Sequence, residues 1–283
     1  MSIDLKTISE LREKTGAGLN DCKSALEEAG GNIDQALELM RKKGELKAAK
    51  KADRAVKEGI VSVAAKDGKY AFTALACETD FVSRGADFQS ASTELSQKLL
   101  ESSIEEFKSW SEEKIKELVL KIGENIQLAD YGIFQGPIVG TYIHSNKKVA
   151  GVCVLSGGDQ EVANDIAMQI AAMSPKWLNP ESVEPEIIEK EKEIYREQLK
   201  GEGKPEQIWD KIIEGKLAKF YEENCLTNQT FIKDDSKKIK DLLADNTITD
   251  WKNSKFKKMV LFQVRRYQLM APSLKKSYDT ISR

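Results

Sequence analysis

His144 is the one imidazole in the chain, and the four cysteines lie far apart, at Cys22, Cys77, Cys153 and Cys225. His144 could act as the base for a nucleophilic Cys77 or Cys153 if the fold brought them within hydrogen-bonding reach. Its more ordinary role would be a hydrogen bond at a strand end or an interface. No zinc site or other metal site is expected, because the chain has neither a Cys-x-x-Cys pair nor a second histidine.

The glycine-rich segments do not predict nucleotide binding. The sequence lacks the string Gly-x-x-x-x-Gly-Lys-[Ser/Thr], which forms the phosphate-binding loop of many nucleotide enzymes. Residues 15–18 (Thr-Gly-Ala-Gly) join two expected helices, and residues 201–205 follow a charged helix instead of a strand. We therefore expect no catalytic residues, no cofactor and no small-molecule substrate, and any effect on nucleotides would be exerted on a partner protein.

The segment Cys77-Glu78-Thr79-Asp80-Phe81-Val82-Ser83-Arg84 follows an expected strand and allows two interpretations. In the first, Thr79 or Asp80 caps a short helix and Phe81 packs that helix onto the core. In the second, Asp80 and Phe81 are displayed at a sheet edge and enter the cleft of a partner. Phenylalanine suits such an anchor, because its burial removes much apolar area with little loss of side-chain entropy.

The charge balance argues against a general nucleic-acid coat. The 283 residues include 44 Lys and Arg against 46 Asp and Glu, for a formal charge of −2. Residues 233–283 are locally basic and carry aromatic residues that could stack on single-stranded nucleic acid, namely Trp251, Phe256, Phe262 and Tyr267. The apolar run at 259–264 instead favours a buried element there, so nucleic acid is not the expected partner.

The sequence also indicates a compartment. It shows neither a basic and apolar leader nor an Arg-rich transit pattern, and no run approaches the roughly 20 apolar residues that span a bilayer. We therefore expect a cytoplasmic protein with reduced thiols and no membrane partner.

Several kinds of element must position these residues. The first 54 residues predict three short helices with tight turns, followed by an exposed connecting helix after Gly44. β-Prone runs at 60–64 and 70–75 flank Asp67-Gly68, a strong hairpin signal. Helices are expected at about 86–101 and 111–122.

A second strand-rich stretch runs from residue 126 to 155, with paired runs at 138–143 and 149–154 and a helix at about 162–173. Hairpins followed by helices, without regular alternation, predict an α+β fold with a two-part core of antiparallel sheets. Two amphipathic stretches between residues 181 and 224, joined by a Gly/Pro loop, predict an antiparallel helical hairpin.

Two long strings resemble signatures of the bacterial elongation factor Ts family. The first is Leu11-Arg12-Glu13-Lys14-Thr15-Gly16-Ala17-Gly18-Leu19-Asn20-Asp21-Cys22-Lys23-Ser24-Ala25-Leu26, and the second is Cys77-Glu78-Thr79-Asp80-Phe81-Val82. Shorter matches follow in order: Lys121-Ile122-Gly123-Glu124-Asn125-Ile126, Tyr142-Ile143-His144, Ile166-Ala167-Met168-Gln169-Ile170-Ala171-Ala172 and Leu226-Thr227-Asn228-Gln229. The resemblance covers about residues 1–245.

This resemblance implies guanine-nucleotide exchange on elongation factor Tu, a GTPase of translation. It implies that Thr79, Asp80, Phe81 and Val82 intrude near the Mg²⁺ site of that partner. It further implies partner contacts by Arg12, Leu19, Asn20 and His144.

The implied fold is an N-terminal ubiquitin-associated-like bundle, a two-part core and an inserted helical hairpin. The expected segments are a bundle with its connecting helix (1–54), a first core half (55–135), a second core half (136–180), the hairpin (181–224), a return to the core (225–250) and a divergent basic C-terminal module (251–283).

Some positions depart from the family pattern. Ala74 and Ala76 stand where the family usually has Glu and Asn before the cysteine, and Leu19-Asn20 replaces a commonly apolar pair. Two alternatives stay open: a scaffold that holds partners without altering nucleotide release, and an RNA-binding translation factor that uses the basic tail.

Overall fold

The structure is a computed structural model that describes residues 3–255. Phe256, Phe262 and Tyr267, and most of the expected C-terminal module, lie outside the described residues. Internal contacts divide the described chain into two compact units. Unit 1 holds the residues up to Phe134 together with Ile143–Val149, and unit 2 holds Gln135–Tyr142 and Ala150–Asn253. The mixture of helices and small antiparallel sheets confirms the α+β class.

The N-terminal bundle of unit 1 contains the three expected helices, α1 (Leu5–Thr15), α2 (Leu19–Glu28) and α3 (Ile33–Lys51). The residues after Gly44 are helical, as expected, but they belong to α3, which continues through Gly44, and do not form a separate connecting helix. Gly44 is buried, and a Cβ there would lie 3.5 Å from the Lys116 carbonyl oxygen. This glycine therefore allows α3 to pack closely on a neighbouring helix, and it does not end α3.

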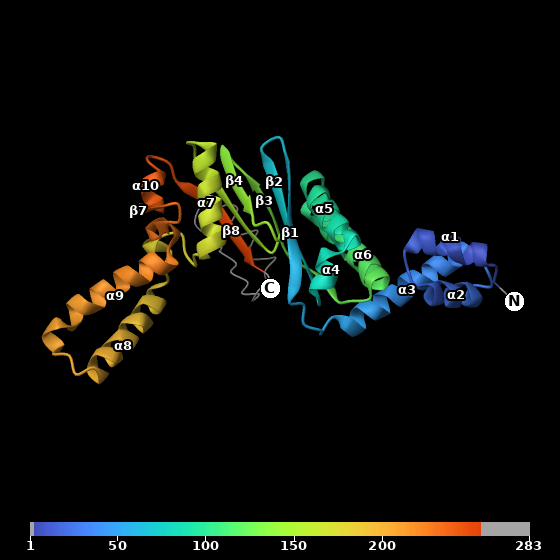
Figure 1. Cartoon of the computed structure of the whole chain (residues 1–283), viewed down its shortest axis with the longest axis horizontal. Helices are drawn as coiled ribbons and strands as arrows, with labels where there is room; N and C mark the ends of the chain where they lie inside the picture. Colours follow the sequence, from blue (N-terminus) through green and yellow to red (C-terminus); the bar gives the residue numbers. More distant parts are fainter. Residues whose placement is uncertain (1–2, 256–283) are drawn as a thin grey trace. The chain divides into compact units, whose positions relative to one another are not determined.

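Unit 1 also contains a three-stranded sheet with order β1-β2-β3 (Figure 1). Its strands are β1 (Glu58–Lys66), β2 (Lys69–Cys77) and β3 (Ile126–Gln135). The predicted hairpin is confirmed, since β1 pairs antiparallel with β2 and the turn residues Asp67 and Gly68 both have positive φ. Helix α5 (Ala86–Glu101) packs on both hairpin strands, and α6 (Ile104–Ile122) packs on α5 and α3.

Helix α6 begins seven residues before the expected start at residue 111. Ser103 accepts a hydrogen bond from the backbone N–H of Glu106, and the Glu106 carboxylate accepts one from the backbone N–H of Ser103. This capping box stabilises a first turn that exposes charged residues and buries Phe107.

Unit 2 contains a second three-stranded sheet, with order β4-β5-β8. Its elements are β4 (Ile138–Ile143), β5 (Val149–Leu155), β8 (Ile248–Lys255) and the helix α7 (Gln160–Met173). Helix α7 packs very closely on this sheet where the strands carry glycines. A Cβ on Gly140 would lie 2.0 Å from the Ala163 carbonyl oxygen, and a Cβ on Gly151 would lie 2.1 Å from the Ala167 carbonyl oxygen.

The predicted helical hairpin is confirmed by two helices in contact, α8 (Pro185–Gly201) and α9 (Trp209–Asn224) (Figure 1). Its base packs through Val183, Phe220 and Cys225. The chain then forms a small pair of strands, β6 (Thr230–Phe231) and β7 (Asp234–Lys238), and the short helix α10 (Ile239–Leu242).

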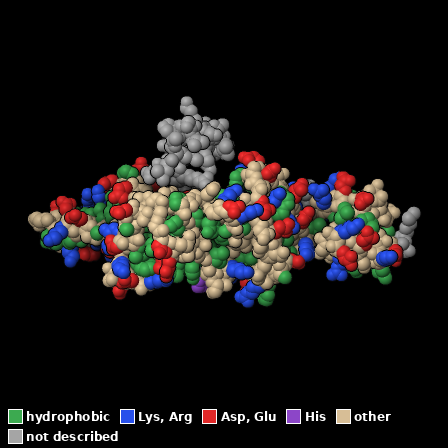
Figure 2. Space-filling model, turned by 90° about the horizontal axis from the view of Figure 1, so that it is seen from above, with side chains coloured by type: hydrophobic (Ala, Val, Ile, Leu, Met, Phe, Trp, Pro, Cys, Tyr) green, Lys and Arg blue, Asp and Glu red, His purple; other side chains and the backbone are tan. Residues whose placement is uncertain are grey.

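Trp251, one of the aromatic residues that could have stacked on single-stranded nucleic acid, is instead a core residue. It is 7% exposed and packs in the core of unit 2. On the face shown in Figure 2, basic and acidic side chains are interspersed over the described surface. No helix among residues 3–255 combines the length and apolarity needed to cross a membrane.

Candidate functional site

Phe81 is displayed on the surface, which supports the second of the two interpretations of its segment. It lies in the first turn of α4 (Asp80–Arg84) and is 86% exposed. Thr79 caps this helix, as the first interpretation expected, because its hydroxyl accepts a hydrogen bond from the backbone N–H of Val82. The side chain that packs on the core is Val82 instead of Phe81.

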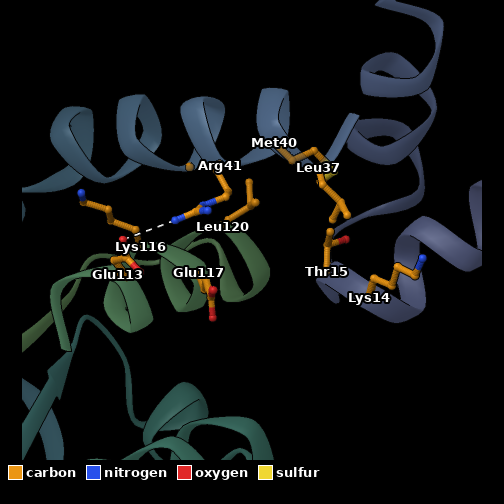
Figure 3. Close-up of a pocket in the computed structure, with 10 residues that line it drawn as sticks. Lys14, Thr15, Leu37, Met40, Arg41, Glu113, Lys116, Glu117 and Leu120 are labelled. Carbon is orange, nitrogen blue, oxygen red and sulfur yellow. Dashed lines mark hydrogen bonds and ion pairs between the residues drawn. The ribbon is translucent and has the colours of Figure 1, made fainter. Parts of the chain in front are cut away.

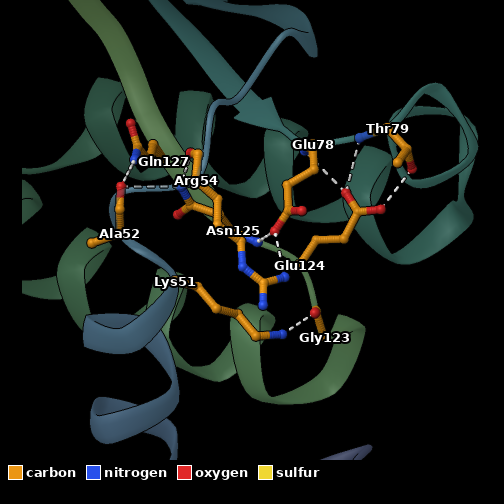
Figure 4. Close-up of polar contacts among 9 residues, drawn as sticks. All are labelled: Lys51, Ala52, Arg54, Glu78, Thr79, Gly123, Glu124, Asn125 and Gln127. Carbon is orange, nitrogen blue, oxygen red and sulfur yellow. Dashed lines mark hydrogen bonds and ion pairs between the residues drawn. The ribbon is translucent and has the colours of Figure 1, made fainter.

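The backbone that carries Phe81 is held by one carboxylate from a distant part of the chain (Figure 4). Glu124 Oε2 accepts hydrogen bonds from the backbone N–H groups of Glu78 and Thr79, each at 3.0 Å. Its Oε1 accepts the Thr79 hydroxyl at 2.6 Å. Glu124 thereby satisfies the two backbone donors at the point where the chain leaves β2 for α4.

A second carboxylate, that of Glu78, accepts a hydrogen bond from the segment that carries Glu124. Glu78 Oε1 accepts the backbone N–H of Asn125 at 2.6 Å and lies 3.5 Å from the Arg54 guanidinium. Asn125 is buried, and its side-chain amide donates to the carbonyl oxygens of Ala52 and Arg54 (Figure 4). The end of β2, the segment before β3 and the chain after α3 are thus joined in one polar network.

Asp80 occupies the first turn of α4, next to Phe81. Its carboxylate forms an ion pair with Arg84 at 3.1 Å, and its side chain is 39% exposed. Such a carboxylate is accessible to a partner and can exchange its arginine for another cation or donor, because an exposed pair of this kind contributes little free energy.

The thiols do not support cysteine chemistry. Burial, with smaller contributions from Glu124 and Glu58, raises the pKa of Cys77 to about 12, and burial raises that of Cys153 to about 12. Each thiol donates to a backbone carbonyl oxygen, Cys77 to Thr79 and Cys153 to Ala163. A protonated buried thiol is a poor nucleophile, so the possible dyad with His144 receives no support.

Arg12, Leu19 and Asn20 lie together around the turn between α1 and α2. Arg12 is in the last turn of α1, while Leu19 and Asn20 begin α2, and all three are exposed. The turn begins at Gly16, which has a φ of +63° and lies against the side chain of Lys121 near the end of α6. Glu124 follows that same end of α6.

His144 lies in the turn after β4 and is exposed. The same turn is held on unit 1 by two neighbouring residues. The Lys147 carbonyl oxygen accepts the backbone N–H of Val61 at 2.8 Å, and Lys148 forms an ion pair with Glu58. His144 therefore belongs to the same compact unit as Phe81 and Arg12, although these residues come from three separate segments.

A pocket of about 150 Å³ lies where α3 and the end of α1 meet α6 (Figure 3). Leu37, Met40 and Leu120 contribute its apolar lining, and Arg41 and Glu113 form an ion pair at 3.3 Å beside it. Its volume is below the range of about 300–1,000 Å³ typical of small-molecule sites. Among residues 3–255, no group of three His, Cys, Asp or Glu side chains is placed to hold a metal ion.

The sequence patterns assign no role to Glu124 or Asn125, although both lie in one of the strings that carry the family resemblance. A signal was present: Gly123-Glu124-Asn125 follows an expected helix, where a glycine ends the helix and polar side chains are free to make distant contacts. Their partners, 45 or more residues away, cannot be read from that pattern.

Comparison with known proteins bears directly on the family. A sequence model described as "Elongation factor TS" matches residues 78–266. A protein named elongation factor Ts from Hydrogenobaculum sp. (strain Y04AAS1) is 45% identical, over 88% of this chain and 96% of its own length. Proteins of the same name from Deinococcus radiodurans and Chlorobium phaeobacteroides (strain BS1) are 43% and 41% identical, over 86% and 87% of this chain and 96% and 92% of their own lengths. The chain belongs to the elongation factor Ts family.

Proposed function

We propose that this chain, a translation elongation factor that exchanges nucleotide on elongation factor Tu, releases GDP by disturbing the Mg²⁺ and phosphate site of that GTPase. GTP then binds the emptied site. The chain itself performs no covalent step, so it acts as an exchange factor and not as an enzyme. The observation that supports this mechanism is a phenylalanine left 86% exposed on a backbone that is otherwise tied down by hydrogen bonds.

Phe81 serves as the wedge in this mechanism. Its ring has water around it in the free chain, so its transfer into a cleft of the partner is favourable by about 1.5–3 kcal/mol. This free energy can be used to displace groups that hold Mg²⁺. Because Mg²⁺ demands near-ideal octahedral geometry, a small displacement of its ligands weakens its binding strongly.

Asp80 supplies a carboxylate beside the wedge. A negative charge near a site arranged for phosphates and a cation competes with the phosphates for hydrogen-bond donors and for the metal. Thr79 and Val82 hold this pair in place, one as the helix cap and the other by packing on the core. We assign partner contact to the segment 79–82 as a whole.

Further partner contacts are assigned to Arg12, Leu19, Asn20 and His144. Leu19 is 49% exposed and offers apolar area, while Arg12, Asn20 and His144 offer hydrogen-bonding groups on the same unit. We propose that the N-terminal bundle has a ubiquitin-associated-like form and docks through the turn that these first three residues flank. In this proposal these contacts provide the affinity for Tu, and insertion of Phe81 causes the release of GDP.

Reciprocity constrains the mechanism. If the bound exchange factor lowers the affinity of Tu for nucleotide, then bound nucleotide must lower the affinity of Tu for the exchange factor by the same ratio. Incoming GTP therefore also displaces the exchange factor, and no energy source is needed.

The test is release of fluorescent GDP from the cognate Tu by substoichiometric amounts of the chain. We expect Phe81→Ala to lower the maximal release rate about 10- to 100-fold, which corresponds to the free energy of burying one aromatic ring. Leu46→Ala is the matched control, because Leu46 is another large apolar residue, 63% exposed, outside the assigned contacts.

Release by Phe81→Ala at the parent rate would contradict the wedge mechanism. Tight binding of Tu by the parent chain without faster release would instead support a scaffold. Salt-sensitive RNA binding that is lost when residues 256–283 are removed, with no effect of the chain on GDP release, would support the RNA-binding alternative.

A further inference from the structure

We infer that Glu124 is a positioning residue for nucleotide exchange: its carboxylate fixes the backbone from which Phe81 projects. This inference rests on the proposed function, in which Phe81 is the wedge. Glu124 itself need not touch the partner, since its hydrogen bonds run to the chain segment that precedes α4.

The Glu124 carboxylate accepts three hydrogen bonds from residues 78 and 79, and we call this arrangement the clamp. One oxygen receives two successive backbone N–H groups, and the other receives the hydroxyl of Thr79, which also caps α4. Two charge-assisted bonds to adjacent amides restrict the backbone more than a single bond would, because both peptide planes must face the same carboxylate. Figure 4 shows the carboxylate of Glu124 directed at Thr79.

Such a clamp is needed because α4 is too short to be stable by itself. It contains five residues, about one and a half turns, and isolated helices of that length do not persist in water. Val82 contributes one apolar contact to the core, while Phe81 contributes none in the free chain because it projects into solvent. Without Glu124, the end of β2 would lose its fixed direction and Phe81 would sample many orientations.

The residue that follows Glu124 is buried and makes hydrogen bonds to two other chain segments. Asn125 is 3% exposed, and its side chain holds the carbonyl oxygens of Ala52 and Arg54. Its backbone N–H is in turn held by Glu78. The residue next to Glu124 is therefore immobilised, so the position of Glu124 relative to β2 is determined by hydrogen bonds among three chain segments.

This arrangement predicts which kinetic parameter depends on Glu124. Docking of the factor through its other contacts needs no ordered Phe81, whereas insertion of the ring needs it aimed at the cleft. Loss of the clamp should therefore lower the maximal rate of GDP release and leave the half-saturating concentration of the factor nearly unchanged.

The experiment measures fluorescent-GDP release from Tu over a range of factor concentrations. For Glu124→Ala we expect a maximal rate lower by about tenfold, the order of loss that small misplacement of a reacting group produces. The half-saturating concentration should change by less than about twofold. Glu124→Gln should recover most of the rate, because its amide oxygen can accept both N–H groups and its NH₂ can donate to Thr79.

Two further variants separate positioning from a loss of folding. Glu124→Asp keeps the charge but shortens the reach by one methylene, so it should lower the rate as Glu124→Ala does. Glu106→Gln is the matched control, because Glu106 also accepts a backbone N–H and a hydroxyl, from Ser103, but at the opposite end of α6. That variant should release GDP at the parent rate.

A double-mutant cycle then tests whether Glu124 acts through Phe81. Once Phe81 is replaced by alanine, Glu124→Ala should lower the rate no further, since the group that it positions is gone. An additive loss would contradict the inference, and so would parent rates for folded Glu124→Ala and Glu124→Asp. If Phe81→Ala releases GDP at the parent rate, the proposed function fails. If Phe81→Ala lowers that rate but the Glu124 variants do not, only the positioning role of Glu124 fails.

Discussion

Cys77, Cys153 and Cys225 are weaker acids than ordinary cysteines, each with a pKa raised to about 12. Burial is the largest cause in all three, because a thiolate loses its hydration in the core. Nearby carboxylates add to the shift, those of Glu124 and Glu58 at Cys77 and that of Glu181 at Cys225. These thiols behave as small apolar core residues with a weak hydrogen-bond donor.

The raised pKa values predict how stability depends on pH. In the unfolded chain a thiol titrates near 9, whereas in the folded chain Cys153 titrates near 12. Below pH 9 both states keep the proton, and above it the unfolded state loses the proton first. The free energy of unfolding should therefore fall between pH 9 and 12, by about 1–2 kcal/mol at pH 10 for Cys153 alone.

Urea unfolding of the parent and of Cys153→Ala at pH 7 and pH 10 checks this expectation. The parent should lose more free energy of unfolding between the two pH values than the variant does, because only the parent carries this buried thiol. Equal losses would show that Cys153 titrates normally in the folded chain.

At the scale of elements, the contact of α7 with the sheet of unit 2 depends on glycines. Gly140 in β4 and Gly151 in β5 face the helix so closely that a Cβ would meet a backbone carbonyl oxygen at 2.0 and 2.1 Å. Backbone atoms cannot move aside as flexible side chains can. The small side chains of Ala163 and Ala167 belong to the same close approach.

Gly151→Ala should therefore destabilise the chain by about 1–3 kcal/mol, the usual range for overpacking a core. Gly215 provides the matched control, because it lies in α9 and a Cβ added to it would have no atom within 4 Å. Gly215→Ala should be neutral or stabilising by up to about 1 kcal/mol, since alanine is the better helix former. Thermal unfolding of the two variants measures the difference, and similar melting temperatures would contradict the packing argument.

At the scale of the whole molecule, the two units have separate cores. The core of unit 1 is built from α5, α6 and the β1-β2-β3 sheet, with Leu95 fully buried in it. The core of unit 2 is built from α7, β5 and β8, with Ile170 fully buried. None of the described residues belongs to both cores, so each unit has its own apolar source of stability.

We expect Leu95→Ala and Ile170→Ala each to destabilise mainly its own unit, by about 2–5 kcal/mol. Native-state hydrogen exchange should then be accelerated in the unit that carries the substitution, by about tenfold or more, with little change in the other. Mass spectrometry of peptic peptides measures the hydrogen exchange of each unit separately. Equal acceleration in both units would show that they unfold as one cooperative body.

Much of the fold could be predicted from local sequence signals. Asp67-Gly68 between β-prone runs specified a hairpin, because few residues adopt the positive φ values of that turn. The boundaries of α5 and the pairing of α8 with α9 also followed from apolar periodicity and from glycine and proline at the breaks. Likewise, the two long strings beginning at Leu11 and at Cys77, together with the shorter matches that follow them, predicted the family.

Other features depended on contacts between distant residues. Gly44 would ordinarily weaken a helix, but packing on α6 keeps α3 continuous. Trp251 lies among basic residues in the sequence and is nevertheless buried. The bond from Thr79 to Glu124 spans 45 residues. Sequence by itself therefore determined the family and the class of fold, and it left two interpretations of Phe81 open. Only the tertiary structure decided what holds that residue in place, because a carboxylate finds its hydrogen-bond donors in space and not along the chain.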